Sequence, residues 1–80
     1  MQTIFIFCKC ELGMAYDVAD KAILNVESIS EVHSISGEHD LLMKAYLEDN
    51  IDLGHFVTDN IQTLTGIKET FTLIGFKAFS

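Results

Sequence analysis

The chain has 80 residues, of which 49% are hydrophobic, and it contains no proline. Acidic side chains outnumber lysine and arginine by 12 to 5, which gives a formal net charge of −7. Nucleic-acid binding draws most of its affinity from cations that neutralise phosphates, so this balance argues against direct contact with DNA or RNA. It argues equally against an anionic membrane surface, and no apolar run approaches the roughly 18 residues of a membrane-spanning helix.

A chain of this length makes one domain, which we expect to span residues 1–80. Its apolar content exceeds what so small a core can readily hide, so part of that surface should meet a partner chain. The first residues lack the pattern of a signal peptide, and we therefore expect a cytoplasmic protein.

The first predicted element is a strand from Thr3 to Cys10, rich in β-branched and aromatic residues. Its side chains are apolar on both faces, so helices should cover one face of the sheet and another surface the opposite face. A helix follows from about Ala15 to Val26. Its apolar stripe comprises Val18, Ala19, Ala22, Ile23 and Val26.

A second strand around Val32 leads to a turn at Gly37, and a third strand follows from Leu41 to Leu47. The second helix should run from about Ile51 to Leu64, with Asp49 or Asn50 as its cap and Gly66 just past its end. Its inner stripe comprises Leu53, Phe56, Val57, Ile61 and Leu64. The last strand should span Lys68 to Phe79, with Phe71, Leu73 and Phe79 on one face and Ile74, Phe76 and Ala78 on the other.

A shift of 38 residues lays the chain on itself, so that Ile23 falls on Ile61 and Gly37 on Gly75. The halves 1–37 and 38–75 would thus be two copies of one strand–helix–strand unit. Right-handed crossovers then predict an α+β, ferredoxin-like βαββαβ sandwich with antiparallel strand order 4-1-3-2 and both helices on one face. The uncovered face should pack against a second copy as an isologous dimer.

The turn Gly37-Glu38-His39-Asp40 is the most polar point between two apolar strands. Such a turn commonly does no more than close a hairpin. It would also set backbone amides beside a carboxylate, an arrangement that suits a zwitterion: the amides bind the α-carboxylate and Asp40 receives the α-ammonium. Thr70 and Thr72 project their hydroxyls from one face of the last strand, although threonine needs no function to occur in a strand.

The turn, together with the segment Leu64-Thr65-Gly66-Ile67-Lys68-Glu69-Thr70-Phe71-Thr72, resembles the effector domain of the Lrp/AsnC (leucine-responsive and AsnC) family of bacterial and archaeal regulators. The resemblance extends from about Thr3 to Ile74. In that family the turn is usually glycine, an acidic residue, a ring and aspartate. Here His39 stands where tyrosine is common, which bears on the side-chain preference of the pocket.

The resemblance implies a domain that dimerises through its sheets, often closes into a ring of dimers such as an octamer, and binds amino acids between dimers. Carried over, Gly37, Glu38, His39 and Asp40 would form the effector loop, and Thr70 and Thr72 would add hydroxyl contacts. No cofactor is implied. Full-length members carry a helix-turn-helix domain ahead of this one, and because the first strand begins by residue 3 we expect this chain to lack that domain. We therefore expect a stand-alone sensor, not an enzyme, that modulates transcription by assembling with partners such as full-length relatives.

Two alternatives stay open. The first is a metal carrier that uses Cys8 and Cys10 with His33, His39 or His55, although closely spaced cysteines more often simply pack in a core. The second is a small dimeric ferredoxin-like enzyme in which His39 and Asp40 serve as an acid/base pair.

Overall fold

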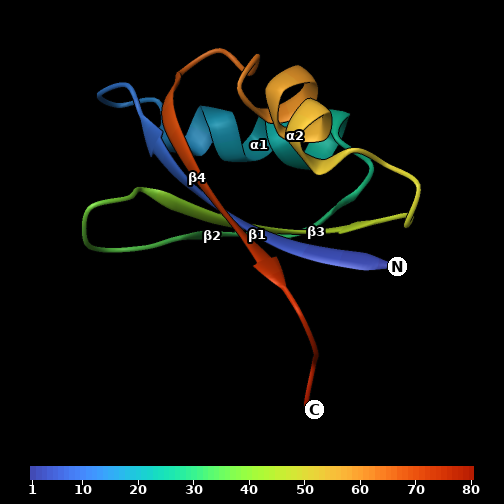
Figure 1. Cartoon of the computed structure of the whole chain (residues 1–80). Coiled ribbons are helices and arrows are strands. Elements are labelled where there is room, and N and C mark those ends of the chain that lie inside the picture. The colour runs from blue at the N-terminus through green and yellow to red at the C-terminus, as the bar shows by residue number, and fades with distance from the viewer.

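The computed structural model covers all 80 residues and contains one antiparallel sheet with its helices on a single side (Figure 1). The elements are β1 (Gln2–Cys10), α1 (Ala15–Asn25), β2 (Ile29–Ser34), β3 (Leu41–Leu47), α2 (Leu53–Phe56), the π-helix η1 (Val57–Ile61) and β4 (Ile67–Gly75). The strand order is β2-β3-β1-β4, which is the predicted order 4-1-3-2 counted from the other edge. The predicted ferredoxin-like fold is therefore confirmed, and the order strand, helix, strand occurs twice.

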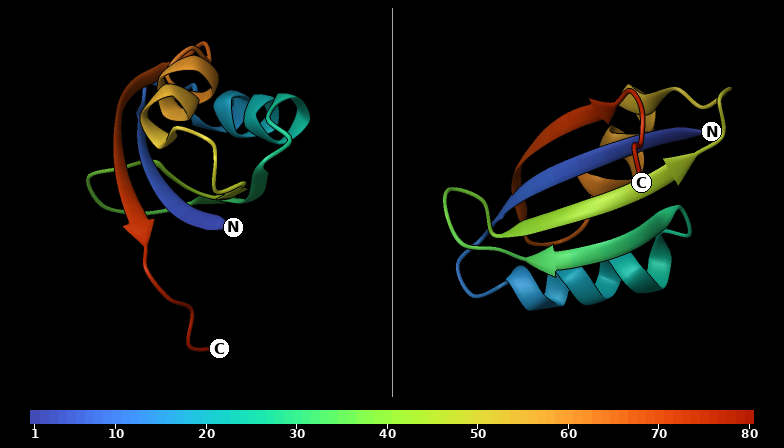
Figure 2. Two further views of the ribbon diagram at one scale, coloured as in Figure 1. Left: turned by 45° about the vertical axis from the view of Figure 1, so that its right-hand side comes forward. Right: turned by 90° about the horizontal axis from the view of Figure 1, so that it is seen from below.

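Strand β1 lies in the middle of the sheet, between β3 and β4 (Figure 2). Both pairings are antiparallel: Phe5 stands opposite Lys44 of β3 and Leu73 of β4. Cross-strand partners share a face of the sheet, so this register decides which side chains face the helices.

The core lies between the sheet and the helices and contains no buried polar side chain. Alternate residues of β1 supply its centre, because Ile4, Ile6 and Cys8 point toward the helices and are fully buried. The other buried residues are Cys10, Val18, Ala22, Val26, Ile29, Leu41, Met43, Ala45, Leu47, Phe56, Val57 and Ile61.

The first helix matches its predicted range to within one residue, but one residue of the predicted inner stripe was wrong. Val18, Ala22 and Val26 are buried, whereas Ile23 is 53% exposed. Successive residues rotate by about 100° around a helix, so Ile23 lies roughly a quarter turn away from Ala22. That rotation carries Ile23 out of the contact with the sheet.

The second helix is shorter than predicted and begins later. It starts at Leu53 because Asp52 is its N-cap, with Oδ1 accepting the His55 amide at 3.0 Å. Asp49, one of the predicted caps, instead lies 2.9 Å from the N-terminal ammonium group of Met1. The hydrogen bond from the His55 amide is the main cause of the lowered pKa of Asp52.

The helix widens into η1 and stops at Ile61, not at Leu64. Two side chains bond to backbone carbonyls there: Asn60 Nδ2 donates to the Phe56 oxygen at 3.2 Å and Thr63 Oγ1 donates to the Asp59 oxygen at 2.8 Å. Side chains of this kind compete with the regular backbone ladder, which accounts for the irregular second half. The predicted inner residues Phe56, Val57 and Ile61 are nonetheless buried.

The last strand ends at Gly75 and does not reach Phe79 as predicted. Gly75 pairs with Thr3, close to the beginning of β1, so the chain runs past the end of its only partner strand. Residues 76–80 therefore leave the sheet and extend to the side opposite the helices (Figure 1). None of the helices has the length and apolar character that crossing a membrane requires.

The two cysteines belong to the core. Cys8 and Cys10 lie on the helix-facing side of β1 and both thiols are free. Burial, followed by the neighbouring Cys10, raises the pKa of Cys8 to about 12. Because a metal binds the thiolate, this environment opposes metal binding by Cys8, and no group of three or more His, Cys, Asp or Glu side chains gathers closely enough to hold an ion.

Replacing Gly66 with alanine should lower the free energy of unfolding by about 3 kcal/mol, measured by urea denaturation. Gly66 has φ +103°, and a Cβ there would lie 2.8 Å from Val18 Cγ2 and 3.0 Å from Met14 Cβ. The control is Gly13→Ala, where φ is +77° and no atom lies within 4 Å of an added Cβ. The control should cost about 1 kcal/mol, and equal losses at both positions would contradict the packing argument.

The raised pKa of Cys8 predicts a loss of stability at high pH. An unfolded thiol ionises near its ordinary pKa of 9.0, whereas the folded thiol holds its proton to about 12. Above pH 9 the unfolded state therefore binds fewer protons, and stability falls as the pH rises toward 12, by up to about 1.4 kcal/mol per pH unit. Urea denaturation at a series of pH values should show a shallower fall in Cys8→Ala, and identical slopes in both proteins would refute this environment for Cys8.

Candidate functional site

The predicted effector loop is the connection between β2 and β3. The Ile35 amide donates to the Asp40 carbonyl oxygen at 3.0 Å, which closes the loop. Gly37 has φ +114°, a left-handed conformation that favours glycine, and open space surrounds its α-carbon. Gly37 and Glu38 are exposed to solvent, and neither lines a cavity of the single subunit.

Asp40 has a structural role that the sequence did not predict. Its carboxylate Oδ2 accepts the Cys10 amide at 2.8 Å, and its own amide donates to the Cys8 carbonyl at 2.8 Å. These bonds hold the start of β3 against the end of β1. The carboxylate also contributes, after burial, to the raised pKa of the Cys10 thiol.

Asp40 also lines a cavity of about 300 Å³ beside the loop that joins β1 to α1. The cavity is bordered by Cys10, Glu11, Leu12, Gly13, Ala15, Tyr16 and Asp40. Leu12 and Tyr16 expose large apolar side chains there. A volume of this order is at the lower end of the range for small-molecule sites.

His39 turns away from that cavity, toward the face of the sheet opposite the helices. Its ring centroid lies 5.4 Å from that of Phe7 and 6.3 Å from that of Phe71, stacked on the latter with an interplanar angle of 27°. Two neighbouring loop residues therefore contact different surfaces. His39 contacts the face of the sheet opposite the helices, and Asp40 contacts the end of β1.

Thr70 and Thr72 lie on the helix-facing side of β4, as their pairing with Cys8 and Ile6 requires. They line a groove of about 400 Å³ between β4 and the second helix, bordered by Leu53, Gly54, Val57, Thr58, Gln62, Thr70, Thr72 and Ile74. Gln62 Nε2 donates to Thr70 Oγ1 at 2.8 Å. Sequence reasoning missed Gln62, because no local pattern links a polar residue at the end of a helix to a strand hydroxyl eight positions later.

Within one subunit the predicted site residues thus form two groups. Asp40 lines the cavity near α1, whereas the two threonines line the groove near α2, and no single cavity contains both. Strand β1 lies between them, since Cys8 pairs with Leu41 on one side and with Thr70 on the other. Sequence reasoning also missed Leu12 and Tyr16, which line the cavity with Asp40. The signal that could have identified them is their position as two large apolar residues on either side of the turn at Gly13.

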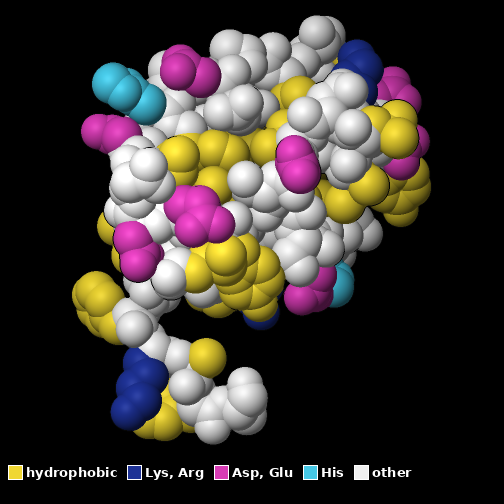
Figure 3. Space-filling model, turned by 90° about the vertical axis from the view of Figure 1, so that its right-hand side faces the viewer, with side chains coloured by type: hydrophobic (Ala, Val, Ile, Leu, Met, Phe, Trp, Pro, Cys, Tyr) yellow, Lys and Arg dark blue, Asp and Glu magenta, His cyan; other side chains and the backbone are white.

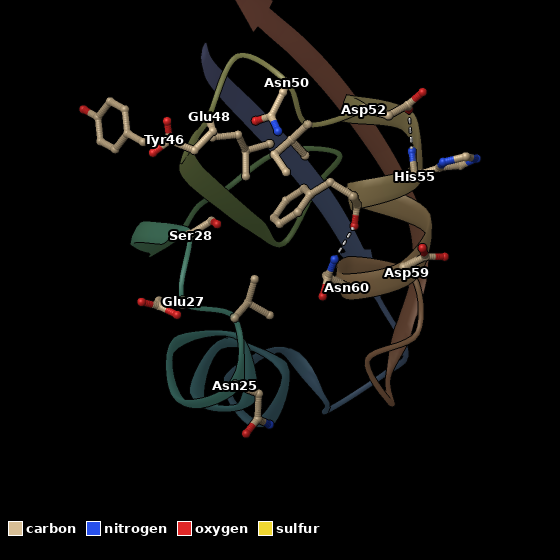
Figure 4. Close-up of a pocket in the computed structure, with 14 residues that line it drawn as sticks. Asn25, Glu27, Ser28, Tyr46, Glu48, Asn50, Asp52, His55, Asp59 and Asn60 are labelled. Carbon is tan, nitrogen blue, oxygen red and sulfur yellow. Dashed lines mark hydrogen bonds between the residues drawn. The ribbon is translucent and has the colours of Figure 1, made fainter. Parts of the chain in front are cut away.

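A larger cavity, of about 810 Å³, lies at the opposite end of the molecule and contains none of the predicted site residues. Figure 4 shows its lining: Glu27, Glu48, Asp52 and Asp59 surround it, and the bonds from His55 to Asp52 and from Asn60 to Phe56 order its edge. Acidic side chains border a hollow with an apolar floor in Figure 3. Four carboxylates disfavour an anionic ligand at this cavity.

The open face of the sheet is the second surface of interest, and we define it by the side chains that point away from the helices. It comprises Thr3, Phe5, Phe7, Lys9, Glu31, His33, Leu42, Lys44, Tyr46, Glu69, Phe71 and Leu73. Phe71 is 54% exposed and Leu73 is 45% exposed. No element of the chain covers this face, which lies below the sheet in Figure 1.

The charges on the open face are partly paired. Glu31 lies 2.8 Å from His33 Nε2 and 3.9 Å from Lys44 Nζ. The hydrogen bond with His33, and then the charge of Lys44, lower the pKa of Glu31. Lys44 also lies 5.9 Å from the ring centroid of Phe5 and 5.2 Å from that of Tyr46, so aromatic faces flank its ammonium group.

Comparison with known families gives a match over nearly the whole chain. Residues 3–80 match the family model of the Lrp/AsnC ligand binding domain. An uncharacterized HTH-type transcriptional regulator of Pyrococcus horikoshii is 32% identical over 64 residues, which is 80% of this chain and 43% of that protein. Homocitrate synthase of Sulfolobus acidocaldarius is 30% identical over 64 residues, which is 80% of this chain but 14% of the enzyme. The chain therefore spans less than half the length of these curated relatives.

Solved structures share the fold. TTHA0845 from Thermus thermophilus superposes with a TM-score of 0.86 at 30% identity, covering 100% of this chain and 99% of that one. The transcriptional regulator NMB0573 of Neisseria meningitidis, in complex with L-Met, superposes with a TM-score of 0.84 at 19% identity, covering 99% of this chain and 52% of that one. The match to the family model carries the assignment that the sequence motifs predicted, and the chain belongs to the Lrp/AsnC ligand-binding domain family.

Proposed function

We propose that this chain is an amino-acid-responsive regulatory and oligomerisation domain that dimerises through its open face. The observation that carries the proposal is the match of residues 3–80 to the Lrp/AsnC ligand binding domain. The amino acid complex of the Neisseria regulator, which has the same fold, supports an amino acid as the effector class. The protein would act in the cytoplasm, modulate transcription through its partners, and catalyse no reaction itself.

Dimerisation is supported by the composition of the open face. Phe5, Phe7, Leu42, Phe71 and Leu73 form an apolar centre, and the charged residues Lys9, Glu31 and Glu69 border it. An apolar centre with a polar rim is the usual anatomy of a protein interface. A second copy presents the same self-complementary surface, as an isologous dimer requires.

Effector binding would use Asp40 together with residues of a neighbouring dimer. One carboxylate oxygen of Asp40 is engaged by the Cys10 amide, which leaves the other to receive an α-ammonium group. The exposed loop amides around Gly37 and Glu38 would receive the α-carboxylate. The hydroxyls of Thr70 and Thr72 line a separate groove, so in this proposal they would reach the effector from the neighbouring dimer of a ring.

The loop supplies a physical link between effector and assembly. Asp40 borders the effector cavity, and the adjacent His39 packs on Phe7 and Phe71 of the open face. An effector that fixes Asp40 would therefore also restrict the position of a ring at the dimer interface. Such a ligand shifts the equilibrium between assemblies only by its differential affinity for them.

The partners would be further copies of the chain and full-length relatives that carry a helix-turn-helix domain. The same unit makes up 43% of a transcriptional regulator and 14% of a homocitrate synthase. A regulator and a biosynthetic enzyme can both use a domain that senses a small molecule or assembles subunits. This shared use supports a regulatory role for the domain, in preference to DNA binding or catalysis. A dimer of this chain would exchange subunits with a full-length regulator of the family through the open face.

Saturation with the right amino acid should raise thermal stability. At about 100 times its dissociation constant, a ligand adds roughly 2.7 kcal/mol to the free energy of unfolding. A melting screen over the amino acids tests this, with Asp40→Asn as the variant, because asparagine keeps an oxygen that can accept the Cys10 amide but removes the charge. We expect the dissociation constant of Asp40→Asn to rise at least tenfold.

The matched control for that screen is Asp20→Asn, which makes the same change on the exposed side of α1. It should leave the response intact. The effector proposal fails if no amino acid at tens of millimolar shifts the melting temperature, and the assignment of Asp40 fails if Asp40→Asn responds like the wild type.

Replacing Phe71 with aspartate should dissociate the dimer, raising its dissociation constant at least 100-fold in sedimentation equilibrium. The reason is that an unpaired carboxylate would be buried between two sheets. Ile23→Asp is the control, because Ile23 is 53% exposed and Phe71 is 54% exposed, but Ile23 lies on the helix layer. Circular dichroism checks that both variants fold, and a Phe71→Asp protein that is folded and still dimeric would rule out the open face as the interface.

A further inference from the structure

The C-terminal arm, which we define as residues 76–80, has almost no apolar contact with its own subunit. Phe76 is 100% exposed and Phe79 is 89% exposed. The one interaction of Phe79 is with Lys77, whose Nζ lies 5.2 Å from the ring centroid. Figure 3 shows the arm as a protrusion that carries apolar side chains and a lysine away from the body.

The arm leaves the sheet on the side of the open face. In Figures 1 and 2 it departs from the end of β4 in the direction opposite to the helices. Gly75 allows the chain to pass close to β1 where the arm begins, because a Cβ there would lie 3.3 Å from both the Phe5 ring and the Thr3 carbonyl oxygen. The arm therefore points into the volume that a sheet packed on the open face would occupy.

A groove of about 240 Å³ begins where the arm leaves the sheet and continues the open face. Residues of β1 and β3 form its floor, namely Thr3, Phe5, Lys44 and Tyr46, and Met1 with residues 75–78 forms its walls. The rings of Phe5 and Tyr46 and the alkyl part of the Lys44 side chain can pack against an apolar side chain. Because an isologous dimer repeats every contact, an exchanged arm would find the same β1 and β3 residues on the other subunit, in place of that subunit's own arm.

The charge of the arm also suits a second copy. Lys77 is its only charged side chain, whereas the whole chain carries 12 acidic residues and a net charge of −7. On the open face, Glu31 and Glu69 stand opposite Lys44 and Lys9, so the face itself carries no acidic excess. The cationic arm is therefore complementary to the net charge of a second copy of the chain and not to the open face in particular.

We propose that the arms are exchanged between the subunits of the dimer, so that Phe76 and Phe79 of each chain pack on the open face of its partner. This inference rests on the proposed sheet-to-sheet dimer. It adds a second, peripheral contact, in which each subunit contributes to the surface of the other. Aromatic side chains anchored in this way are common sources of interface affinity.

The test compares the full chain with the double variant Phe76→Ser, Phe79→Ser by sedimentation equilibrium over a range of concentrations. We expect the dissociation constant of the dimer to rise at least tenfold, with the fold unchanged by circular dichroism. The control is Ile23→Ser, Leu24→Ser, which removes two exposed apolar side chains from the helix layer and should leave the constant unaltered.

A second measurement separates exchange from folding back onto the same subunit. In a dimer mixed from isotope-labelled and unlabelled chains, filtered nuclear Overhauser spectra should connect the rings of Phe76 and Phe79 with open-face protons of the other chain. A wild-type protein that stays monomeric would refute the dimer itself. A dimer whose constant is unchanged in the double variant, or whose arm rings contact only their own chain, would refute the arm exchange alone.

Discussion

The structure depends on a central strand that is apolar on both of its faces. The helix-facing residues of β1, Ile4, Ile6 and Cys8, are fully buried, whereas Phe5 and Phe7 on the other face are only half-buried. The helices can cover one side of a sheet, and here both helices lie on the same side. Within one subunit only the helix-facing side of β1 is removed from water. The proposed assembly follows from the apolar side that stays exposed.

The open face and the loop between β2 and β3 are in direct contact. The loop between β2 and β3 is tied to the end of β1 by Asp40 and to the open face by the His39 ring. In the proposed mechanism, a change at the loop would therefore reach the proposed dimer surface through adjacent residues. This short connection is what would let a small ligand alter an assembly equilibrium, provided that it binds one assembly better than another.

The sequence was sufficient for the fold because local patterns and the overall topology agree. Alternation in the strands, the stripe Val18, Ala22 and Val26, and the turn at Gly37 all indicate the same arrangement. The errors occurred at element ends. The second helix stops early because Asn60 and Thr63 bond to its carbonyls, and β4 cannot extend to Phe79 because Gln2 is the only residue of β1 beyond the Thr3–Gly75 pair. Both causes are tertiary or side-chain effects that periodicity does not contain.

The candidate site was predictable only in part. The assignment of Asp40 and the two threonines to an effector site stays a prediction, and the motif did not indicate that Asp40 already accepts a hydrogen bond from the Cys10 amide. Nor did the motif indicate that the side chains of His39 and Asp40 point to different surfaces, because the direction of a side chain in a loop depends on the register of the strands around it. The proposed site would draw residues from more than one subunit, and such a site leaves no local signal in one sequence because the assembly fixes the residues that complete it.

The most direct test of the account is the mass of the protein in solution as a function of concentration. One subunit has a mass of 8.9 kDa. The proposed sheet-to-sheet assembly predicts twice that mass, or a larger even multiple, throughout the micromolar range, with an amino acid effector changing the distribution among multiples. A stable species of 8.9 kDa at micromolar concentration, with the open face in contact with water, would contradict it.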